Sequence, residues 1–158
     1  MLRAKSPSDV RSSLIKYAAF CLSRRPYFEE AIRQKLVLRS KKLKLSDTNN
    51  IISDILRDLK KSGYLDDPYL AQAYARRQLD KGYGPRIISL KLNRLKVGKD
   101  IIDLALEEAD FEKQVTAIRK ITSKYRNSDK YKLTSKLYSR GFNSSVINKV
   151  FDLEYVGD

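Results

Sequence analysis

The sequence predicts an all-α protein built from three tandem three-helix bundles that form an elongated, curved array. Apolar residues recur at the three- and four-residue spacing of amphipathic helices, and no segment sustains the alternating pattern of a strand. Glycine, proline and aspartate mark helix ends at short intervals, most densely between Gly63 and Pro85. At 158 residues the chain is long enough for one ordinary domain or for several small units that share a core.

Three helices are expected in the first unit, residues 8–63. Ser8 and Asp9 are typical of a helix N-terminus. The second helix lacks a polar cap, because an aromatic pair that ends at Phe28 stands in that position. Gly63 supplies the left-handed residue that ends the third helix. The three helices should cover residues 8–23, 27–39 and 49–62.

The central unit, residues 64–109, carries the strongest signals for helix ends. Asp66 or Asp67 can cap its first helix, and a proline follows in the first turn. Gly82 should end that helix, and a Gly-Pro pair begins the next one. The three helices should cover residues 68–81, 85–96 and 99–108. The residues that we predict to fix the angles between units are Gly63, Asp66, Asp67, Gly82, Gly84 and Pro85.

The third unit, residues 110–155, repeats the apolar pattern of the central one. A shift of 45 residues, which takes Ile88 onto Leu133, places seven apolar positions on apolar positions. A unit of this size has little core of its own, so neighbouring units should stack. Its first helix should cover residues 110–125, and two more should begin near residues 128 and 144. The shift matches Ile88, Leu92, Val97, Ile101, Ile102, Ala105 and Leu106 with Leu133, Leu137, Phe142, Val146, Ile147, Val150 and Phe151.

The tyrosines divide into an expected core group and an open group. Tyr69 and Tyr83 suit core packing and contact with a partner equally well. Tyr64 and Tyr74 lie beside apolar helix positions, which favours burial in the core. Tyr131 and Tyr138 belong to the apolar set of the helix that begins near residue 128.

The charge balance indicates a polyanionic partner. The chain has 33 Lys and Arg against 19 Asp and Glu, a formal charge of +14, and most of the excess lies toward the two ends. No apolar run approaches the ~20 residues that a membrane span needs, and the first residues lack the apolar core of a secretion signal. We therefore expect a monomeric protein of the cytoplasm that makes no contact with membranes.

Composition argues against an enzyme and against a bound cofactor or metal. Histidine, the commonest general base and a usual zinc ligand, is absent. The single Cys21 lies among apolar residues, where a buried, unreactive thiol is expected. Adjacent carboxylates at Asp66 and Asp67 are better explained as a helix cap than as a metal site. The nearby glycines lack the following Lys-Ser or Lys-Thr of a phosphate-binding loop.

Basic residues are the stronger candidates for function. For any one of them, a solvated surface explains the residue as well as a contact does, but the collective excess calls for a partner. In the central unit the candidates, with one tyrosine, are Arg76, Arg77, Lys81, Tyr83, Arg86, Lys91 and Arg94. In the third unit they are Lys124, Arg126, Lys130, Lys132, Lys136 and Arg140. Arg24 and Arg25 complete the set in the first unit.

Four segments together resemble the RecX family of regulatory proteins. They are Leu22–Arg25 (LSRR), Gly63–Asp67 (GYLDD), Lys81–Arg86 (KGYGPR) and Arg140–Phe142 (RGF), and they occur in the family's order. The resemblance implies a tandem array of three-helix modules that binds the RecA recombinase and its filament on single-stranded DNA. It also implies modulation, usually inhibition, of filament extension, ATP hydrolysis, strand exchange and co-protease activity in recombination, DNA repair and the SOS response.

Two hypotheses follow for function. In the first, the array lies in the groove of a RecA filament, bridges protomers and contacts the single-stranded DNA within the filament, either capping filament ends or filling the groove. In the alternative, residues 85–96 and 99–108 form a helix-turn-helix that binds DNA directly. The alternative is disfavoured because the second of these helices would present Lys99, Asp100 and Asp103 to a groove lined by phosphates, which repel the two carboxylates. Weak non-specific affinity for DNA is expected in either case.

Overall fold

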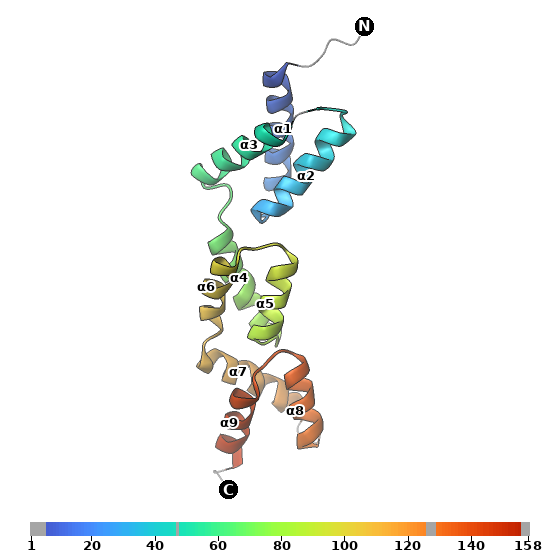
Figure 1. Cartoon of the computed structure of the whole chain (residues 1–158). Helices are drawn as coiled ribbons and strands as arrows, with labels where there is room; N and C mark the ends of the chain where they lie inside the picture. The colour runs from blue at the N-terminus through green and yellow to red at the C-terminus, as the bar shows by residue number, and fades with distance from the viewer. Residues whose placement is uncertain (1–5, 47, 126–128, 156–158) are drawn as a thin grey trace. The chain divides into compact units, whose positions relative to one another are not determined.

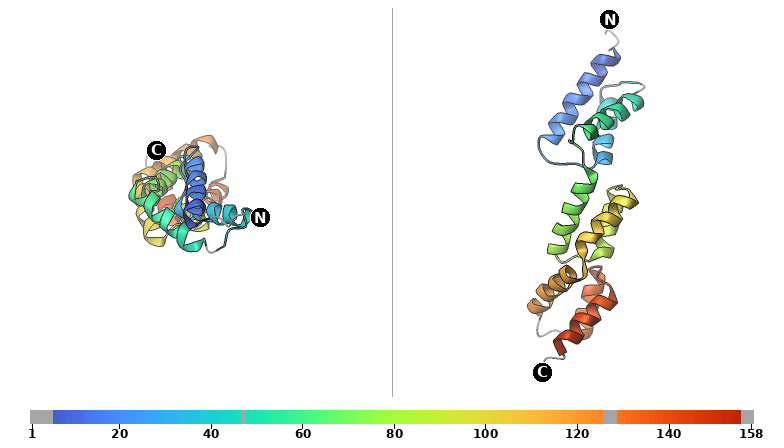
Figure 2. Two further views of the ribbon diagram at one scale, coloured as in Figure 1. Left: turned by 90° about the horizontal axis from the view of Figure 1, so that it is seen from above. Right: turned by 90° about the vertical axis from the view of Figure 1, so that its left-hand side faces the viewer.

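The computed structural model describes residues 6–46, 48–125 and 129–155, and in this part of the chain all regular structure is helical (Figure 1; further views in Figure 2). This confirms the predicted all-α class. No helix among the described residues is both long and apolar enough to cross a membrane. The α-helices are α1 (Pro7–Leu22), α2 (Glu29–Lys42), α3 (Asn49–Lys61), α4 (Asp67–Asp80), α5 (Pro85–Arg94), α6 (Lys99–Leu106), α7 (Phe111–Thr122), α8 (Lys130–Ser139) and α9 (Ser144–Tyr155). Short 3-10 helices, Glu107–Ala109 and Ser123–Tyr125, follow α6 and α7.

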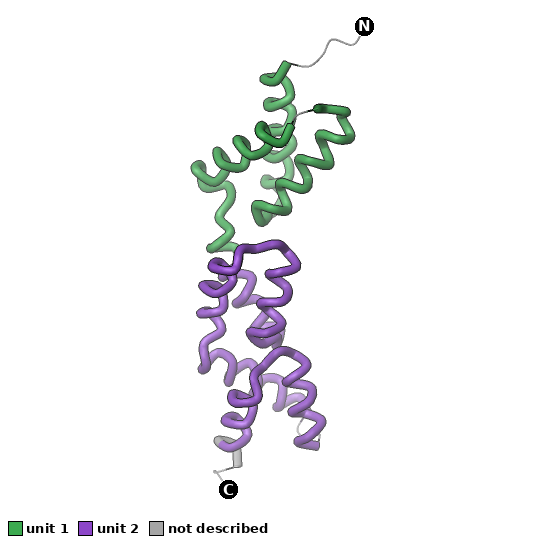
Figure 3. Tube along the Cα trace, in the orientation of Figure 1, with its two compact units in different colours: residues 1–70 green, residues 71–158 purple. Residues whose placement is uncertain are grey.

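The chain divides into two compact units, residues 1–70 and residues 71–158 (Figure 3). The division falls inside α4, after its first turn. The second unit holds the rest of α4 and helices α5–α9, so the two later helix triplets of the sequence lie in one unit. The finer division into three modules, 8–63, 64–109 and 110–155, and the curved array stay predictions.

The first unit is a bundle of α1, α2 and α3. The N-cap of α1 lies two residues earlier than predicted, at Ser6 and not at Ser8. The backbone N–H of Asp9 donates to the Ser6 hydroxyl at 3.2 Å, and the Ser6 N–H donates to the Asp9 carboxylate at 3.2 Å. Pro7 fits the first helical position because no bond to its nitrogen is needed there. The core consists of Val10, Leu14, Ala18, Cys21, Ile32, Leu36, Ile52, Ile55, Leu56 and Leu65.

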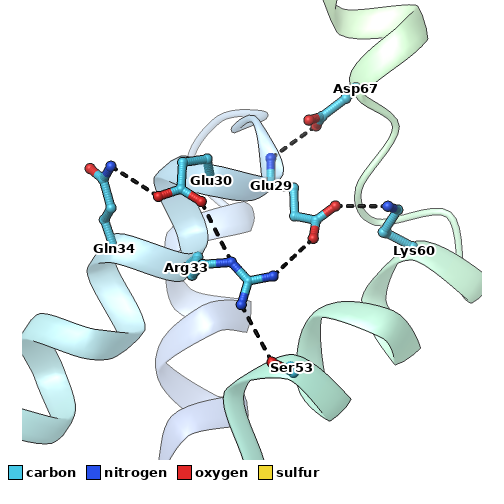
Figure 4. Close-up of polar contacts among 7 residues, drawn as sticks. All are labelled: Glu29, Glu30, Arg33, Gln34, Ser53, Lys60 and Asp67. Carbon is cyan, nitrogen blue, oxygen red and sulfur yellow. Dashed lines mark hydrogen bonds and ion pairs between the residues drawn. The ribbon is translucent and has the colours of Figure 1, made fainter. Parts of the chain in front are cut away.

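A distant residue accepts the hydrogen bond from the N-terminus of helix α2. Phe28 occupies the cap position and is buried, but its side chain accepts no bond. The N–H of Glu29 instead donates to the carboxylate of Asp67 at 2.9 Å (Figure 4). The Glu29 carboxylate pairs with Lys60 at 2.7 Å and with Arg33 at 3.3 Å. Asp67 thus joins the start of α4 to the start of α2.

The two adjacent aspartates have separate roles. Asp66 caps α4, since its carboxylate accepts the N–H of Tyr69 at 3.0 Å. Asp67 faces α2, and it is half-buried. Burial raises the pKa of the Asp67 carboxyl, and the charge of Glu29 adds to the rise, while the bond from the Glu29 N–H opposes it. Gly63, just before this pair, has φ +74°, as its predicted role at a helix end requires.

The second unit depends on a close approach of two glycine backbones. The N–H of Gly84 donates to the carbonyl of Arg140 at 2.8 Å, and the N–H of Arg86 donates to the carbonyl of Gly141 at 3.2 Å. A Cβ placed on Gly84 would lie 2.5 Å from the Gly141 carbonyl carbon. The start of α5 is therefore attached to the turn between α8 and α9 at a distance that only glycine allows. Gly82, with φ +81°, ends α4 as predicted.

The core of the second unit contains the repeated apolar positions. Five of the seven central positions and all seven of the third unit are buried, and the other two, Ile101 and Leu106, are partly buried.

The tyrosine predictions were mostly wrong. Tyr74 is partly buried, but the remaining expected core tyrosines point to solvent because smaller aliphatic residues fill the core. The exposed fractions are 68% for Tyr64, 80% for Tyr131 and 52% for Tyr138.

We expect Gly84→Ala to lower the free energy of unfolding by about 2 kcal/mol or more, because the new methyl group overlaps the backbone at Gly141. Gly98→Ala is the matched control. Gly98 is also an N-cap with negative φ, and a Cβ there meets nothing within 4 Å. The control should cost less than about 1 kcal/mol. Urea unfolding measures both values, and equal losses would contradict the close approach.

Asp67→Asn should be at least as stable as the wild type at neutral pH, whereas Asp67→Ala should lose about 1 kcal/mol. Asparagine keeps an oxygen for the Glu29 N–H and removes a charge that burial disfavours. The pKa of Asp67 is higher in the folded state than in the unfolded state. Protonation of this carboxyl therefore favours folding: its contribution to the free energy of unfolding is largest at low pH and is lost as the pH rises through the folded-state pKa. The advantage of asparagine should therefore vanish in unfolding experiments below the ordinary pKa of aspartate. An asparagine variant as unstable as the alanine variant at neutral pH would show that the charge itself is needed.

Candidate partner-binding surface

The corner between α4 and α5 holds two candidate cations against one tyrosine. The ammonium of Lys91 lies 3.5 Å from the centroid of the Tyr83 ring and donates to the side-chain oxygen of buried Gln78 at 2.7 Å. The guanidinium carbon of Arg140 lies 5.8 Å from the same centroid. Arg140 also donates to the carbonyls of Lys81 and Gly82 at 3.4 and 3.3 Å. Tyr83 is partly buried, and its ring contacts a lysine from α5 and the arginine that follows α8.

Two further cation–aromatic pairs lie on the same unit. The guanidinium carbon of Arg86 is 4.7 Å from the ring centroid of Tyr138, and Arg86 donates to the Tyr138 carbonyl at 2.6 Å. The ammonium of Lys136 is 3.6 Å from the ring centroid of Tyr125. A hydrogen bond from Lys136 and its positive charge lower the pKa of Tyr125. The α8 helix therefore supplies a ring to one pair and a cation to the other.

The first unit has a comparable group around the turn between α1 and α2. The guanidinium carbon of Arg24 lies 4.6 Å from the centroid of Phe20, and that of Arg25 lies 4.5 Å from the centroid of Tyr27. Lys35 approaches the Tyr27 ring as well, at 5.1 Å. Phe20 is 54% exposed. Both predicted arginines of this unit are therefore exposed cations held beside aromatic rings.

The remaining candidates differ in whether a carboxylate of the same chain already neutralises their charge. Arg76 pairs with Glu108 at 3.0 Å, and both line a cavity of about 360 Å³ between α4 and α7. Its charge is thus less available than the sequence indicates. Lys130 lies 5.4 Å from the ring of Phe151. Arg126 falls outside the described residues. The candidates that are exposed and make no ion pair in the described part of the chain are Arg77, Lys81, Arg94, Lys124 and Lys132.

Cations that rest on aromatic rings suit the binding of an external anion. A ring face stabilises the cation by roughly 0.5–1 kcal/mol at an exposed site and leaves its charge unneutralised. A carboxylate would cancel that charge. Among the described residues, Lys91, Lys136, Arg86 and Arg140 make no ion pair with a carboxylate. This surface can therefore accept phosphates or the carboxylates of a protein.

The sequence identified most of the cations but missed their aromatic partners. Phe20 lies in the last turn of α1, and Arg24 follows four residues later, just after the end of the helix. This spacing could have predicted their contact. The pairing of Arg86 with Tyr138 carries no such signal, because the two residues are 52 positions apart. Their contact depends on the close approach at Gly84.

Comparison with known proteins identifies relatives over most of the length of the chain. The chain is 34% identical over 156 residues to the protein named regulatory protein RecX of Thermotoga sp. (strain RQ2), across 96% of this chain and 86% of that protein. It is 29% identical to the protein of the same name from Deinococcus radiodurans, across 92% of this chain and 70% of that one. No protein-family model matches the chain.

Solved structures agree with this relationship. The crystal structure of RecX from Lactobacillus salivarius superposes with a TM-score of 0.79 over 92% of this chain and 96% of that one, and its 21% identity supports the fold alone. A second structure, described as the crystal structure of regulatory protein RecX, gives a TM-score of 0.77 at 26% identity, over 92% of this chain and 73% of that one.

Lys136→Gln should raise the pKa of Tyr125 back toward the ordinary value of tyrosine, because it removes the hydrogen bond and charge that favour the phenolate. A pH titration of ¹³C-labelled tyrosine by NMR measures the change. Lys132→Gln is the control, since it removes an exposed charge from the same helix that does not contribute to the shift. An unchanged Tyr125 pKa in the Lys136 variant would contradict the contact.

Proposed function

The chain belongs to the RecX family of regulatory proteins, and on this premise we propose that it binds the RecA recombinase and its filament on single-stranded DNA and inhibits them. The observation that carries the proposal is the family relationship across 96% of the chain. The role is regulatory and not catalytic. Filament extension, ATP hydrolysis, strand exchange and co-protease activity are the processes that it would modulate in recombination, DNA repair and the SOS response.

The distribution of cations supports a partner of this kind. Each compact unit has its own group of cations beside aromatic rings. In the first unit the group lies around exposed Arg24 and Arg25, and in the second it lies around exposed Arg86 and partly buried Arg140. Protein carboxylates and DNA phosphates are both available on a nucleoprotein filament. One monomer with two such groups offers two points of attachment, which suits a protein that bridges neighbouring RecA protomers.

Bridging explains inhibition without any chemistry by the inhibitor. If both attachments form only when neighbouring protomers adopt one relative orientation, binding stabilises that orientation by the difference in affinity between the states. The filament is then less able to make the motions that accompany ATP turnover and growth. Inhibition below one inhibitor per RecA would indicate capped filament ends, and inhibition at a fixed ratio would indicate a filled groove.

The helix-turn-helix alternative gains no support from the geometry. Helix α6, which would be the reading helix, has exposed Asp100 and Asp103 and begins with only one cation, Lys99. Carboxylates on that face repel the phosphates that border a DNA groove. Tight, sequence-dependent binding to duplex DNA without RecA would revive the alternative.

We expect the protein to lower ATP hydrolysis by RecA on single-stranded DNA in an assay that regenerates ATP, and to sediment with the filaments. Arg77→Gln combined with Arg94→Gln should raise the inhibitory concentration roughly fivefold to tenfold, because it removes two exposed cations that no carboxylate neutralises. Both side chains are exposed, so the fold should be unaffected.

A matched control keeps the same change in net charge. Lys16→Gln combined with Lys99→Gln removes two exposed lysines outside the candidate set. This variant should inhibit like the wild type. Equal losses in the two variants would mean that net charge alone matters, and unchanged hydrolysis without co-sedimentation for the wild type would overturn the proposal.

A further inference from the structure

Helix α8 exposes two tyrosines that its apolar pattern assigned to the core. Tyr131 is 80% exposed and Tyr138 is 52% exposed, while Leu133 and Leu137 hold the helix against the unit. Exposed tyrosines are common on protein surfaces, but aromatic residues are also enriched where proteins bind partners, since a ring offers a large apolar face and a polar hydroxyl. Two such rings on one helix, beside basic residues, therefore form a candidate binding face.

The two tyrosines lie on the same face of α8. They are seven residues apart, nearly two full turns, so their side chains point in almost the same direction, about 10 Å apart along the helix axis. Thr134 and Ser135, one turn from each tyrosine, are small. This spacing corresponds to about three steps of stacked bases at 3.4 Å per step. The face thus has room for two bases between its rings.

The surroundings of these rings are positive. Between Asp129 and Asp152 the sequence has no acidic residue. Lys132 borders one side of the face, about 100° around the helix from Tyr131, and in the described part of the chain it is exposed and makes no ion pair. Lys136 lies farther around the helix, against the ring of Tyr125. Cations that track a backbone beside aromatic side chains on which bases stack are the two components of a single-stranded nucleic-acid site.

One ring is already held in place. Arg86 lies 4.7 Å from the Tyr138 centroid and is fixed by its 2.6 Å bond to the Tyr138 carbonyl. The cation occupies one side of the ring, and half of the side chain stays exposed to solvent. A base can stack on the exposed part of a ring whose position costs little further entropy to fix.

We propose that the Tyr131–Tyr138 face of α8 binds single-stranded DNA directly by base stacking, without RecA. The inference deepens the proposed function, and rests on it for the choice of DNA, because it assigns one part of the chain to the DNA of the filament and names stacking as the mode of contact. Stacking needs exposed bases, so single strands bind and duplexes of the same length bind much more weakly. It also adds a part of the affinity that salt does not weaken.

The test measures binding of a fluorescein-labelled 20-nucleotide oligo(dT) by anisotropy at several salt concentrations, with a 20-base-pair duplex beside it. Tyr131→Ala combined with Tyr138→Ala should weaken oligo(dT) binding at least about tenfold and leave its salt dependence unchanged. Tyr131→Phe combined with Tyr138→Phe should bind like the wild type, because phenylalanine keeps the ring. Lys132→Gln should reduce the salt slope by about 0.7.

Tyr64→Ala combined with Tyr69→Ala is the matched control, since both tyrosines are similarly exposed, at 68% and 65%, but lie in the first unit. It should not change binding. Circular dichroism checks that each variant keeps its helices. Equal affinity for duplex and single strand, no loss in the alanine variant, or an equal loss in the control would overturn the inference.

The outcome is separable from that of the proposed function. A protein that inhibits RecA but binds oligo(dT) with no dependence on the two tyrosines contradicts only the α8 site. A protein that binds oligo(dT) through these tyrosines but leaves RecA hydrolysis and sedimentation unchanged contradicts only the proposed regulation.

Discussion

The contact between the backbones of Gly84 and Gly141 fixes the position of the start of α5 against the turn between α8 and α9. The start of any helix leaves N–H groups without partners, and here two of them at α5 find carbonyls in the turn before α9. A bond at 2.8 Å between main chains is possible only if neither glycine has a Cβ. The same contact places Arg86 on Tyr138 and Arg140 near Tyr83. These two cation–aromatic pairs thus depend on the absence of a side chain at both glycines.

Much of the fold could be predicted from local signals. Gly63 and Gly82 have the positive φ that helix ends require, and the apolar spacing located all the helices to within a few residues. These features depend on neighbours in sequence. The tyrosines of α8 were assigned wrongly to the apolar face of the helix, because amphipathic spacing does not show how much room the core has. Leu133 and Leu137 already fill the side of α8 that faces the unit.

The candidate surface was predictable in composition but not in detail. An excess of 14 positive charges is visible in the sequence. Which cations keep their charge available depends on tertiary contacts, as the contrast between Arg76 and Arg94 shows, since only Arg76 has a carboxylate partner in the described residues. Rings that hold cations in place reduce the conformational freedom lost on binding, so the pairs around Tyr83 and Tyr125 prepare the surface for an anion.

The hydrogen bond between Glu29 and Asp67 can form only late in the synthesis of the first unit. The two residues are 38 positions apart, so α2 lacks this bond at its N-terminus until the polypeptide has been synthesised beyond α3. A ribosome adds roughly 5–20 residues each second, so the delay is a matter of seconds. The first compact unit extends to residue 70, just past the aspartate that completes it.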